Sequence, residues 1–317
     1  MEKTRASSTA SLRWAILRRA FLTPSNPDHS SLKEIHRISR KALCGFNLIP
    51  CHILNGHEME ELAASLNIKE LEGLKDAYLC YRLPVCRAPT LFLIQRVESH
   101  VHLNDFEICN RYDVDNTGLV CHWPSEDILA YFCLTHAEMF RSKRILELGS
   151  GYGLAGLAIA AGTDAAEVVI SDGNPQVVDY IQRNIQANAG VFGETKVKSM
   201  ILHWKTEQSS NVLNTFDVII ASDCTFFKEF HEGLAHTVKS LLKHSETSEA
   251  LFFAPRRGDS LDKFLEKIGD TGLKFEVVEI YDSKVWNLHL KFLNGDDSSW
   301  PNYDKDHCYP ILVRVSP

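Results

Sequence analysis

The sequence predicts an α/β fold with a Rossmann-like sheet, on two observations. A buried strand from Arg144 to Leu148 runs directly into glycines at positions 149, 151 and 153, and a helix follows. Glycines in such a turn let the backbone approach a ligand that any β-carbon would block. Beyond the turn, strand-like and helix-like stretches alternate, which is typical of a largely parallel sheet covered by helices.

The remaining elements follow in order along the chain. Strands are expected at 167–171, 196–202, 216–221, 250–254, 274–280 and 309–315, and helices at 175–189, 229–243 and 261–270. Pro175 suits the first turn of its helix because its fixed φ is already helical. No helix of ordinary length is evident between the last two strands, so we expect an antiparallel pair joined by a long insertion, residues 281–308.

Three kinds of site use a glycine turn of this type. A phosphate-binding loop needs a lysine after its last glycine, and Tyr152-Gly153-Leu154 has none. A nucleophile elbow separates its serine from the preceding glycine, whereas Ser150 directly follows Gly149. Gly151-x-Gly153-x-x-Gly156 does satisfy the dinucleotide fingerprint, with Asp172 spaced like a ribose-binding acid. The spacing alone therefore leaves NAD open as a cofactor.

Side chains that follow neighbouring strands are candidates for one site, because ligands of open α/β sheets bind at the carboxyl ends of strands. Asp172 can accept hydrogen bonds from both ribose hydroxyls, or it can cap the next helix. The indole of Trp204 can stack on an adenine ring, or it can belong to the core. Asp223, within residues 222–226, can take part in the site or cap the helix that follows it.

The array Glu147-x-Gly149-x-Gly151-x-Gly153 resembles motif I of the seven-strand methyltransferases. That resemblance implies S-adenosylmethionine as the cofactor, with its amino acid part facing the acid and the glycines. It also implies the seven-strand, S-adenosylmethionine-dependent methyltransferase sheet with a small amino-terminal extension. Asp223-Cys224-Thr225-Phe226 resembles the Asp-x-x-Tyr/Phe motif of the family 16 protein lysine methyltransferases, and residues 115–126 resemble the segment before motif I, whose tryptophan, Trp123, contacts the cofactor there.

The resemblance extends from about residue 46 to the end of the chain and implies calmodulin as the protein substrate. It includes Trp123-Pro124-Ser125-Glu126, Leu129-Ala130-Tyr131, Asp172-Gly173-Asn174, residues 252–258 and Tyr309-Pro310. Two small residues depart from the family pattern: Ser150 replaces the usual glycine or alanine, and Ser222 replaces a common alanine. Three other functions stay open: methylation of another protein lysine, a NAD-dependent oxidoreductase, and a binding protein without catalysis.

Methyl transfer from a sulfonium needs a neutral lysine amine in line with the methyl group more than it needs a strong base. We expect Asp223 to orient that amine or the adjoining loop, and Phe226 to line the acceptor channel or belong to the core. We expect Arg256-Arg257 to meet acidic side chains of the target, or to be a solvated pair before a helix. The expected cofactor-binding residues are Trp123, Glu147, Gly149, Gly151, Gly153, Asp172, Asn174, Trp204 and Ser222.

Three segments are expected: a basic helical arm at 1–45, a mostly β subdomain at 46–122 that the resemblance implies, and the methyltransferase domain at 123–317. Strand-like pieces at 90–97 and 106–109 belong to the second. The arm has a local charge of +6 in a chain of net charge −7. Such an arm can steer an acidic partner such as calmodulin. A solvated helix face, nucleic-acid binding and organelle targeting are the alternatives.

Composition agrees with an enzyme of one large domain plus an extension, since 44% of the 317 residues are hydrophobic and 24% are charged. The nine cysteines are scattered and odd in number, so we expect reduced thiols and a cytoplasmic protein, with the nucleus as a second compartment. No cysteine or histidine cluster has metal-ligand spacing, and no apolar run reaches membrane-spanning length. We therefore expect a monomer without metal, membrane or nucleic-acid partner.

Overall fold

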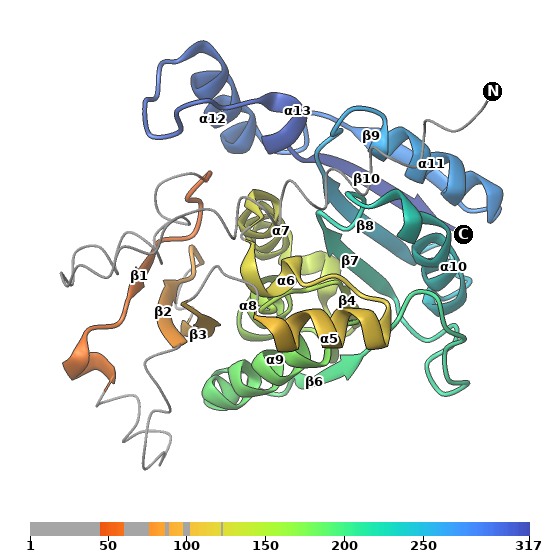
Figure 1. Ribbon diagram of the computed structural model, residues 1–317, viewed down its shortest axis with the longest axis horizontal. Helices are drawn as coiled ribbons and strands as arrows, with labels where there is room; N and C mark the ends of the chain where they lie inside the picture. Colours follow the sequence, from red (N-terminus) through yellow and green to blue (C-terminus); the bar gives the residue numbers. More distant parts are fainter. Residues whose placement is uncertain (1–44, 60–75, 86–88, 98–101, 122) are drawn as a thin grey trace.

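Seven strands form the central sheet of the computed structural model, which describes residues 45–59, 76–85, 89–97, 102–121 and 123–317 (Figure 1). Their order across the sheet is β6-β5-β4-β7-β8-β10-β9. The strands are β4 (Arg144–Leu148), β5 (Glu167–Asp172), β6 (Lys196–Ile201), β7 (Val218–Ser222), β8 (Glu249–Ala254), β9 (Lys274–Val278) and β10 (Ile311–Ser316).

Strands β4 to β8 run parallel, and β10 is antiparallel to both of its neighbours, β8 and β9. The predicted α/β sheet with a closing antiparallel pair is therefore confirmed. The strand order reverses at β4, whose neighbours are β5 on one side and β7 on the other. Ligands of open α/β sheets bind beside such a reversal, at the carboxyl ends of the strands.

Helices cover both faces of this sheet (Figure 1). One face carries α7 (Pro124–Thr135), α8 (Leu154–Gly162) and α9 (Pro175–Ala187), and the other carries α10 (His231–Leu241) and α11 (Ser260–Asp270). Short 3₁₀ helices lie at Ala137–Phe140, Ala189–Val191 and Lys228–Phe230. Pro175 occupies the first turn of α9, as predicted.

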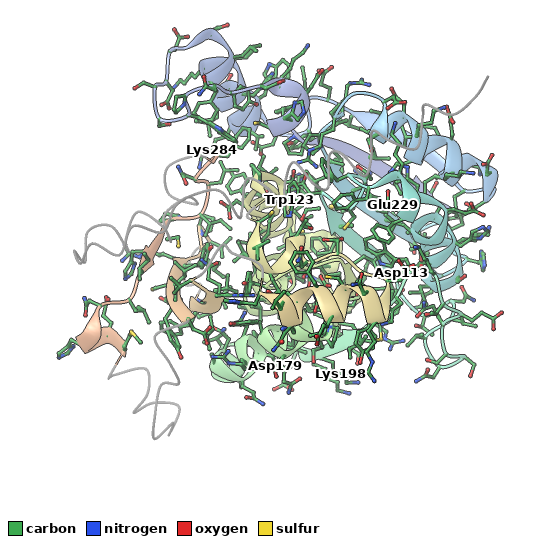
Figure 2. All side chains as sticks on the ribbon, viewed as in Figure 1. Asp113, Trp123, Asp179, Lys198, Glu229 and Lys284 are labelled. Carbon is green, nitrogen blue, oxygen red and sulfur yellow. The ribbon has the colours of Figure 1, made fainter. Side chains whose placement is uncertain are left out.

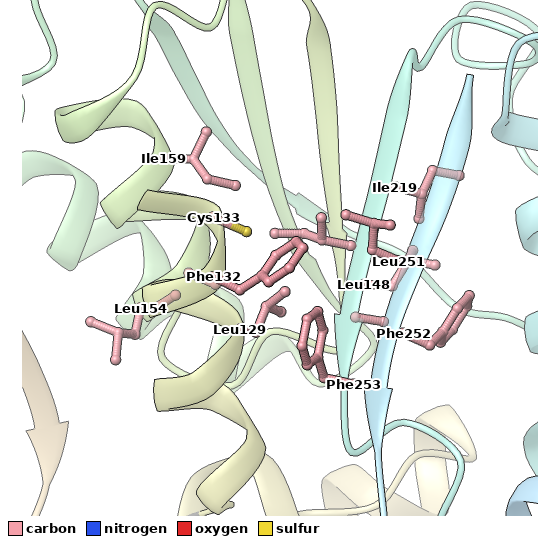
Figure 3. Packing of buried hydrophobic residues seen from close by; sticks show 14 of the residues in the cluster. Leu129, Phe132, Cys133, Leu148, Leu154, Ile159, Ile219, Leu251, Phe252 and Phe253 are labelled. Carbon is pink, nitrogen blue, oxygen red and sulfur yellow. The ribbon is translucent and has the colours of Figure 1, made fainter. Parts of the chain in front are cut away.

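The core under α7 and α8 is apolar and fully buried. Phe132 from α7 packs on Phe253 from β8 with ring centroids 5.1 Å apart, and Figure 3 shows both rings between the helix and the sheet. Leu129 on α7 and Leu148 on β4 have no exposed surface. These contacts fix the amino end of α7, where Trp123 lies, against the carboxyl ends of the strands.

A second, smaller sheet packs beside the first. It contains the antiparallel strands β1 (Cys51–Ile53), β2 (Asp76–Arg82) and β3 (Thr90–Arg96), and helices α5 (Leu103–Tyr112) and α6 (Thr117–Val120) follow it. Side-chain amides of α9 occupy the free edge of β3: Asn184 Oδ1 accepts from the Ile94 amide at 2.6 Å, and Asn188 Oδ1 accepts from the Phe92 amide at 2.8 Å. The small sheet is thereby fixed to the large one.

The strand predicted at 106–109 is wrong, because these residues lie inside α5. The Asp105 carboxylate explains the helix: it accepts hydrogen bonds from the His102 amide at 2.7 Å and from Arg96 at 2.8 Å, so it both caps α5 and ties it to β3. The short run at 106–109, with its aromatic and β-branched residues, cannot reveal that Asp105 pairs with Arg96 on another element.

The insertion between β9 and β10 was expected to lack an ordinary helix, and this too is wrong. It contains the twelve-residue α12 (Ser283–Asn294) and the short α13 (Lys305–Cys308). Asp282 caps α12 by accepting from the amides of Lys284 and Val285 at 2.8 and 2.9 Å. The buried face of α12 contains Val285, His289 and Phe292. Because His289 is polar, the helical period of apolar residues is hard to recognise in the sequence.

No helix within the described ranges is long and apolar enough to cross a membrane. Almost the whole arm predicted at 1–45 lies outside the described residues, and the boundary proposed between 122 and 123 stays a prediction.

Candidate active site

The turn from β4 into α8 has a backbone that only glycine adopts easily. Gly149, Gly151 and Gly153 have φ values of +57°, +57° and +83°. A β-carbon on Gly149 would lie 2.7 Å from the Sγ atom of Cys224 and 3.1 Å from the Trp204 ring. The turn is therefore packed tightly from the side of β7 while its backbone lies at the carboxyl end of the sheet.

Glu147 lies beneath this turn. Only 1% of its surface is exposed, and its Oε2 atom accepts a hydrogen bond of 2.8 Å from the Gly156 amide in the first turn of α8. Burial, together with the nearby Glu126, raises the pKa of Glu147 well above its usual value, against the lowering effect of the Gly156 amide. This placement gives Glu147 an internal role: it joins β4 to the first turn of α8.

Asp172, at the end of β5, lies against the other side of the turn. Its Oδ2 atom accepts from the Gly151 amide at 3.2 Å, and its Oδ1 atom accepts from the Asn174 amide at 2.9 Å. Burial raises the pKa of Asp172 to about 7, although these amides lower it. The helix cap that was the alternative role for Asp172 is provided by Asn174, which accepts from the Gln176 amide at 2.9 Å.

Helix α6 and the loop before it lie against the glycine turn. A β-carbon on Gly118 would lie 3.5 Å from Gly151 Cα and 3.6 Å from Asp172 Oδ2. The Tyr152 hydroxyl donates to the Leu119 carbonyl at 2.7 Å, and the Asn174 side chain donates to the Asp115 carbonyl at 3.4 Å. The segment that precedes motif I in sequence thus covers the turn and the ribose-binding candidate.

Trp204 and Ser222 lie at the ends of β6 and β7 beside the same turn. The Trp204 ring is partly buried and meets Phe230 edge to face at 6.1 Å. Cys224 lies against Gly149, as Trp204 does, and its thiol donates to the Leu148 carbonyl at 3.3 Å. Burial raises the pKa of this thiol, so it stays protonated. Cys224 belongs to the predicted site segment 222–226, but its packing against Gly149 was not predicted, because it depends on how closely β7 approaches the turn.

Phe226 meets Trp123 at a third side of the site. Trp123 is the residue before α7, and Figure 2 shows it near the middle of the face in view. The rings of Trp123 and Phe226 are 5.6 Å apart between centroids. The guanidinium of Arg257, from the loop between β8 and α11, lies 4.8 Å from the Trp123 centroid and 5.1 Å from that of Phe226. Sequence motifs from three distant segments are therefore in direct contact.

Arg257 forms a buried ion pair with Asp223. The Nη2 to Oδ1 distance is 2.6 Å, and the two side chains are 7% and 2% exposed. The expectation that both arginines face the target or the solvent is wrong for Arg257, because its charge is directed inward. The expectation does fit Arg256, whose side chain is 47% exposed and whose Nη1 atom lies 3.4 Å from Asp262 Oδ1.

Within the described part of the chain, no group of three or more His, Cys, Asp or Glu side chains is arranged to hold a metal ion. What the geometry does provide is a glycine cradle that a β-carbon would fill, a carboxylate of raised pKa on one side, and an aromatic wall on the other. This combination fits a nucleoside cofactor, with aromatic side chains beside it.

Comparison with known proteins gives a consistent result. Residues 110–271 match the model of a family described as lysine methyltransferase. The calmodulin-lysine N-methyltransferase of Arabidopsis thaliana is 56% identical over 316 residues, which cover 100% of this chain and 99% of that protein. The mouse (Mus musculus) protein-lysine N-methyltransferase EEF2KMT is 27% identical over 90% of this chain and 83% of its own length. The mouse protein-lysine methyltransferase METTL21E is 30% identical over 53% of this chain and 68% of its own length.

The family match covers the glycine turn, Asp172, Trp204 and the segment from Asp223 to Phe226, and the full-length likeness covers every other part of the site. The chain belongs to the lysine methyltransferase family and is an S-adenosylmethionine-dependent protein-lysine methyltransferase.

Proposed function

We propose that this enzyme transfers methyl groups from S-adenosylmethionine to the ε-amine of a lysine in calmodulin. The observation that carries the proposal is the 56% identity with the calmodulin-lysine N-methyltransferase of Arabidopsis thaliana over 100% of this chain. A likeness of that extent includes the parts outside the cofactor site, where a protein substrate would be recognised.

The cofactor, when bound, supplies a methyl group that is already activated on a positively charged sulfur. We assign its ribose to Asp172, its amino acid part to the turn at Gly149, Gly151 and Gly153, and its adenine to the side of Trp204. The positive φ angles and close packing of the turn support this assignment, because the backbone there can approach a ligand closely. Asn174 and Ser222 complete the rim from the ends of β5 and β7.

We assign the lysine entrance to the wall formed by Trp123 and Phe226, whose rings lie 5.6 Å apart. An apolar wall strips water from the amine and, with the cofactor's positive sulfur nearby, lowers the pKa of the lysine, so that the neutral nucleophile is favoured. Holding this amine in line with the methyl group is then the main task of the protein.

Asp223 acts on the loop and not directly on the amine in this assignment. Its carboxylate is 2% exposed and is engaged by Arg257, so it has no open path to an incoming lysine. Through this ion pair Asp223 sets the position of the segment that ends at Phe226. Of the two roles expected for Asp223, the geometry supports the orientation of the adjoining loop.

The test is methyl transfer from labelled S-adenosylmethionine to unmodified recombinant calmodulin, with mass spectrometry of the product. We expect label on a calmodulin lysine. Asp223→Ala should lower the turnover by about 100-fold, since a displacement of about 1 Å at the acceptor site has an effect of that size. Asp270→Ala, which removes an exposed carboxylate at the end of α11, is the matched control and should keep full turnover.

A second candidate is the methylation of a lysine in another protein. The observation behind it is the 27% identity with the mouse protein-lysine N-methyltransferase EEF2KMT, a relative whose name does not mention calmodulin. Measurable binding of S-adenosylmethionine without any label on calmodulin would contradict the first candidate and favour this one.

We also propose that the basic arm at 1–45 steers calmodulin, and that the enzyme works as a monomer in the cytoplasm, with the nucleus as a second compartment and without a membrane or nucleic-acid partner. The charge of +6 in the arm against −7 for the chain supports the first point. Light scattering during gel filtration and fractionation of cells test the others.

A further inference from the structure

Arg257 joins four parts of the site that are far apart in the sequence. Its guanidinium contacts the Asp223 carboxylate at 2.6 Å and lies over the rings of Trp123 and Phe226. Its backbone amide donates to the Asp306 carbonyl in α13 at 2.8 Å. One residue thus connects the amino end of α7, the segment after β7, the loop after β8 and the insertion before β10.

Both partners of this ion pair have unusual backbones. Asp223 has φ +54° and Arg257 has φ +46°, a region that residues other than glycine seldom adopt. Such conformations persist where the surroundings hold them, and they gather at functional sites. A buried ion pair is also costly to desolvate and is weak evidence for stability as such. Two strained residues and one buried pair at the acceptor wall therefore point to a role in the reaction.

The hydrogen bonding of the pair is incomplete. Both carboxylate oxygens of Asp223 and the Nη1 atom of Arg257 are buried without a well-aligned hydrogen-bond partner among the described residues. The two charges are thus close together, but their hydrogen-bond geometry is poor. Cancellation of charge is what it supplies most directly, because Coulomb attraction depends on distance and little on angle.

We propose that Arg257 is a positioning residue of the methyl transfer: it holds the segment from Asp223 to Phe226 against Trp123, and it cancels the negative charge of Asp223 beside the acceptor channel. The inference rests on the proposed function in one respect, namely that the lysine enters along Trp123 and Phe226.

Cancellation matters because a lone carboxylate near the acceptor would favour the protonated lysine, which cannot attack the methyl group. The other charged or titratable groups around the pair do not replace Arg257. The thiols of Cys224 and Cys308 have pKa values raised by burial and remain neutral. His307 in α13 pairs with Asp304, and Asp172, to which we assign the ribose, accepts from the Gly151 amide. Among the residues that the structure describes, Arg257 is the cation within ion-pair distance of Asp223.

The experiment compares Arg257→Gln, Arg257→Lys and the control Arg141→Gln, an exposed arginine before β4, in methyl transfer to calmodulin from pH 6.5 to 9.5. S-adenosylmethionine is saturating, and kcat and KM are determined separately. For Arg257→Gln we expect kcat about 100-fold lower at pH 7. We expect the rise of kcat on the acid side of its pH profile to move upward by about one pH unit. The loss of kcat relative to the wild type should therefore be smaller at pH 9 than at pH 7. Arg257→Lys should keep the acid side of the profile in place with part of kcat, and Arg141→Gln should match the wild type.

A loss that is equal at every pH would mark a merely structural effect and overturn the proposal, as would a wild-type profile for Arg257→Gln. A second measurement needs no protein substrate: thermal unfolding of Asp223→Asn, Arg257→Gln and the double variant. We expect each single variant to lower Tm by about 5 °C or more, and the double variant to lose clearly less than the sum. Additive losses would contradict the pairing.

The two measurements also separate this inference from the proposed substrate. If the wild type does not label calmodulin, the assignment of the substrate fails. In that case the unfolding cycle still decides whether Arg257 and Asp223 act as a pair, and additive losses would overturn the inference independently.

Discussion

At the scale of single residues, the glycine turn is needed for packing as much as for a ligand. A β-carbon on Gly149 would lie 2.7 Å from Cys224 Sγ, and one on Gly156 would lie 2.6 Å from Glu147 Oε2. The same positions that leave backbone free for the cofactor therefore let β4, β7 and α8 come together. Ligand approach and close packing both require glycine at these positions, and this is why the glycine pattern can be recognised in the sequence.

Asp172 makes cofactor binding depend on pH. Burial raises its pKa to about 7, and ribose hydroxyls would donate to its ionised form. As the pH falls below 7, protonation must be reversed on binding, so the affinity for S-adenosylmethionine should fall by up to about tenfold per pH unit, and it should be level above pH 8. Calorimetric titration from pH 5.5 to 8.5 measures this slope.

In the same titration, Asp172→Asn should bind more weakly and show no slope, while Asp179→Asn, an exposed carboxylate on α9, should follow the wild type. An unchanged slope in Asp172→Asn would assign the pH dependence to another group.

Much of the site could be predicted at this scale, because glycines and acids at strand ends obey backbone demands that are local in sequence. The burial of Arg257 could not, since Arg256 and Arg257 are chemically identical and only the left-handed backbone at Arg257 decides which of them turns inward. The internal place of Glu147 could not either, because it depends on how closely α8 approaches β4.

At the scale of elements, the strands and the helices that alternate with them were predictable from short apolar runs bounded by glycine, proline and acids. α5 and α12 were missed for a common reason: each depends on a capping aspartate, Asp105 or Asp282, and on contacts with elements far away in the chain. Short stretches with mixed polarity carry little periodic signal, and tertiary contacts then determine their structure.

The junction between β3 and α9 gives a prediction at the same scale. Asn184 accepts from the Ile94 amide at 2.6 Å and donates to the carbonyls of Ile94 and Tyr152 at 3.2 and 3.0 Å. Asn184→Ala would leave these buried backbone groups without partners, so the free energy of unfolding should fall by about 2–4 kcal/mol. Urea denaturation measures the loss.

The exposed Asn211→Ala is the control for this change and should stay within about 0.5 kcal/mol of the wild type. A similarly small change for Asn184→Ala would mean that water replaces the amide at the edge of β3, and that the small sheet is attached by its apolar contacts alone.

At the scale of the whole molecule, charge is distributed unevenly: residues 1–45 have +6 while the complete chain has −7. Deletion of residues 1–44 keeps Phe46, which packs edge to face on Phe292 and Trp300 at 5.6 Å in each case. We expect kcat/KM for calmodulin to fall about tenfold at low salt and the deficit to vanish near 0.5 M salt, where charges are screened over a few ångströms.

Steady-state kinetics across a salt series checks this expectation, with kcat at saturating calmodulin and the affinity for S-adenosylmethionine as internal controls that should not change. A deficit that persists at high salt would instead indicate that the deleted segment makes apolar contacts with the substrate or with the enzyme.

The position of β10 has a consequence for how the molecule is made. β9 joins the central sheet only through β10, which is synthesised after it and lies between β8 and β9. On a translating ribosome the first five strands can assemble around the glycine turn, while β9 and the helices that follow it must wait, with their apolar residues uncovered. The edge of β8 is the interface most open to mispairing in the nascent chain, and it is where a chaperone would be needed most.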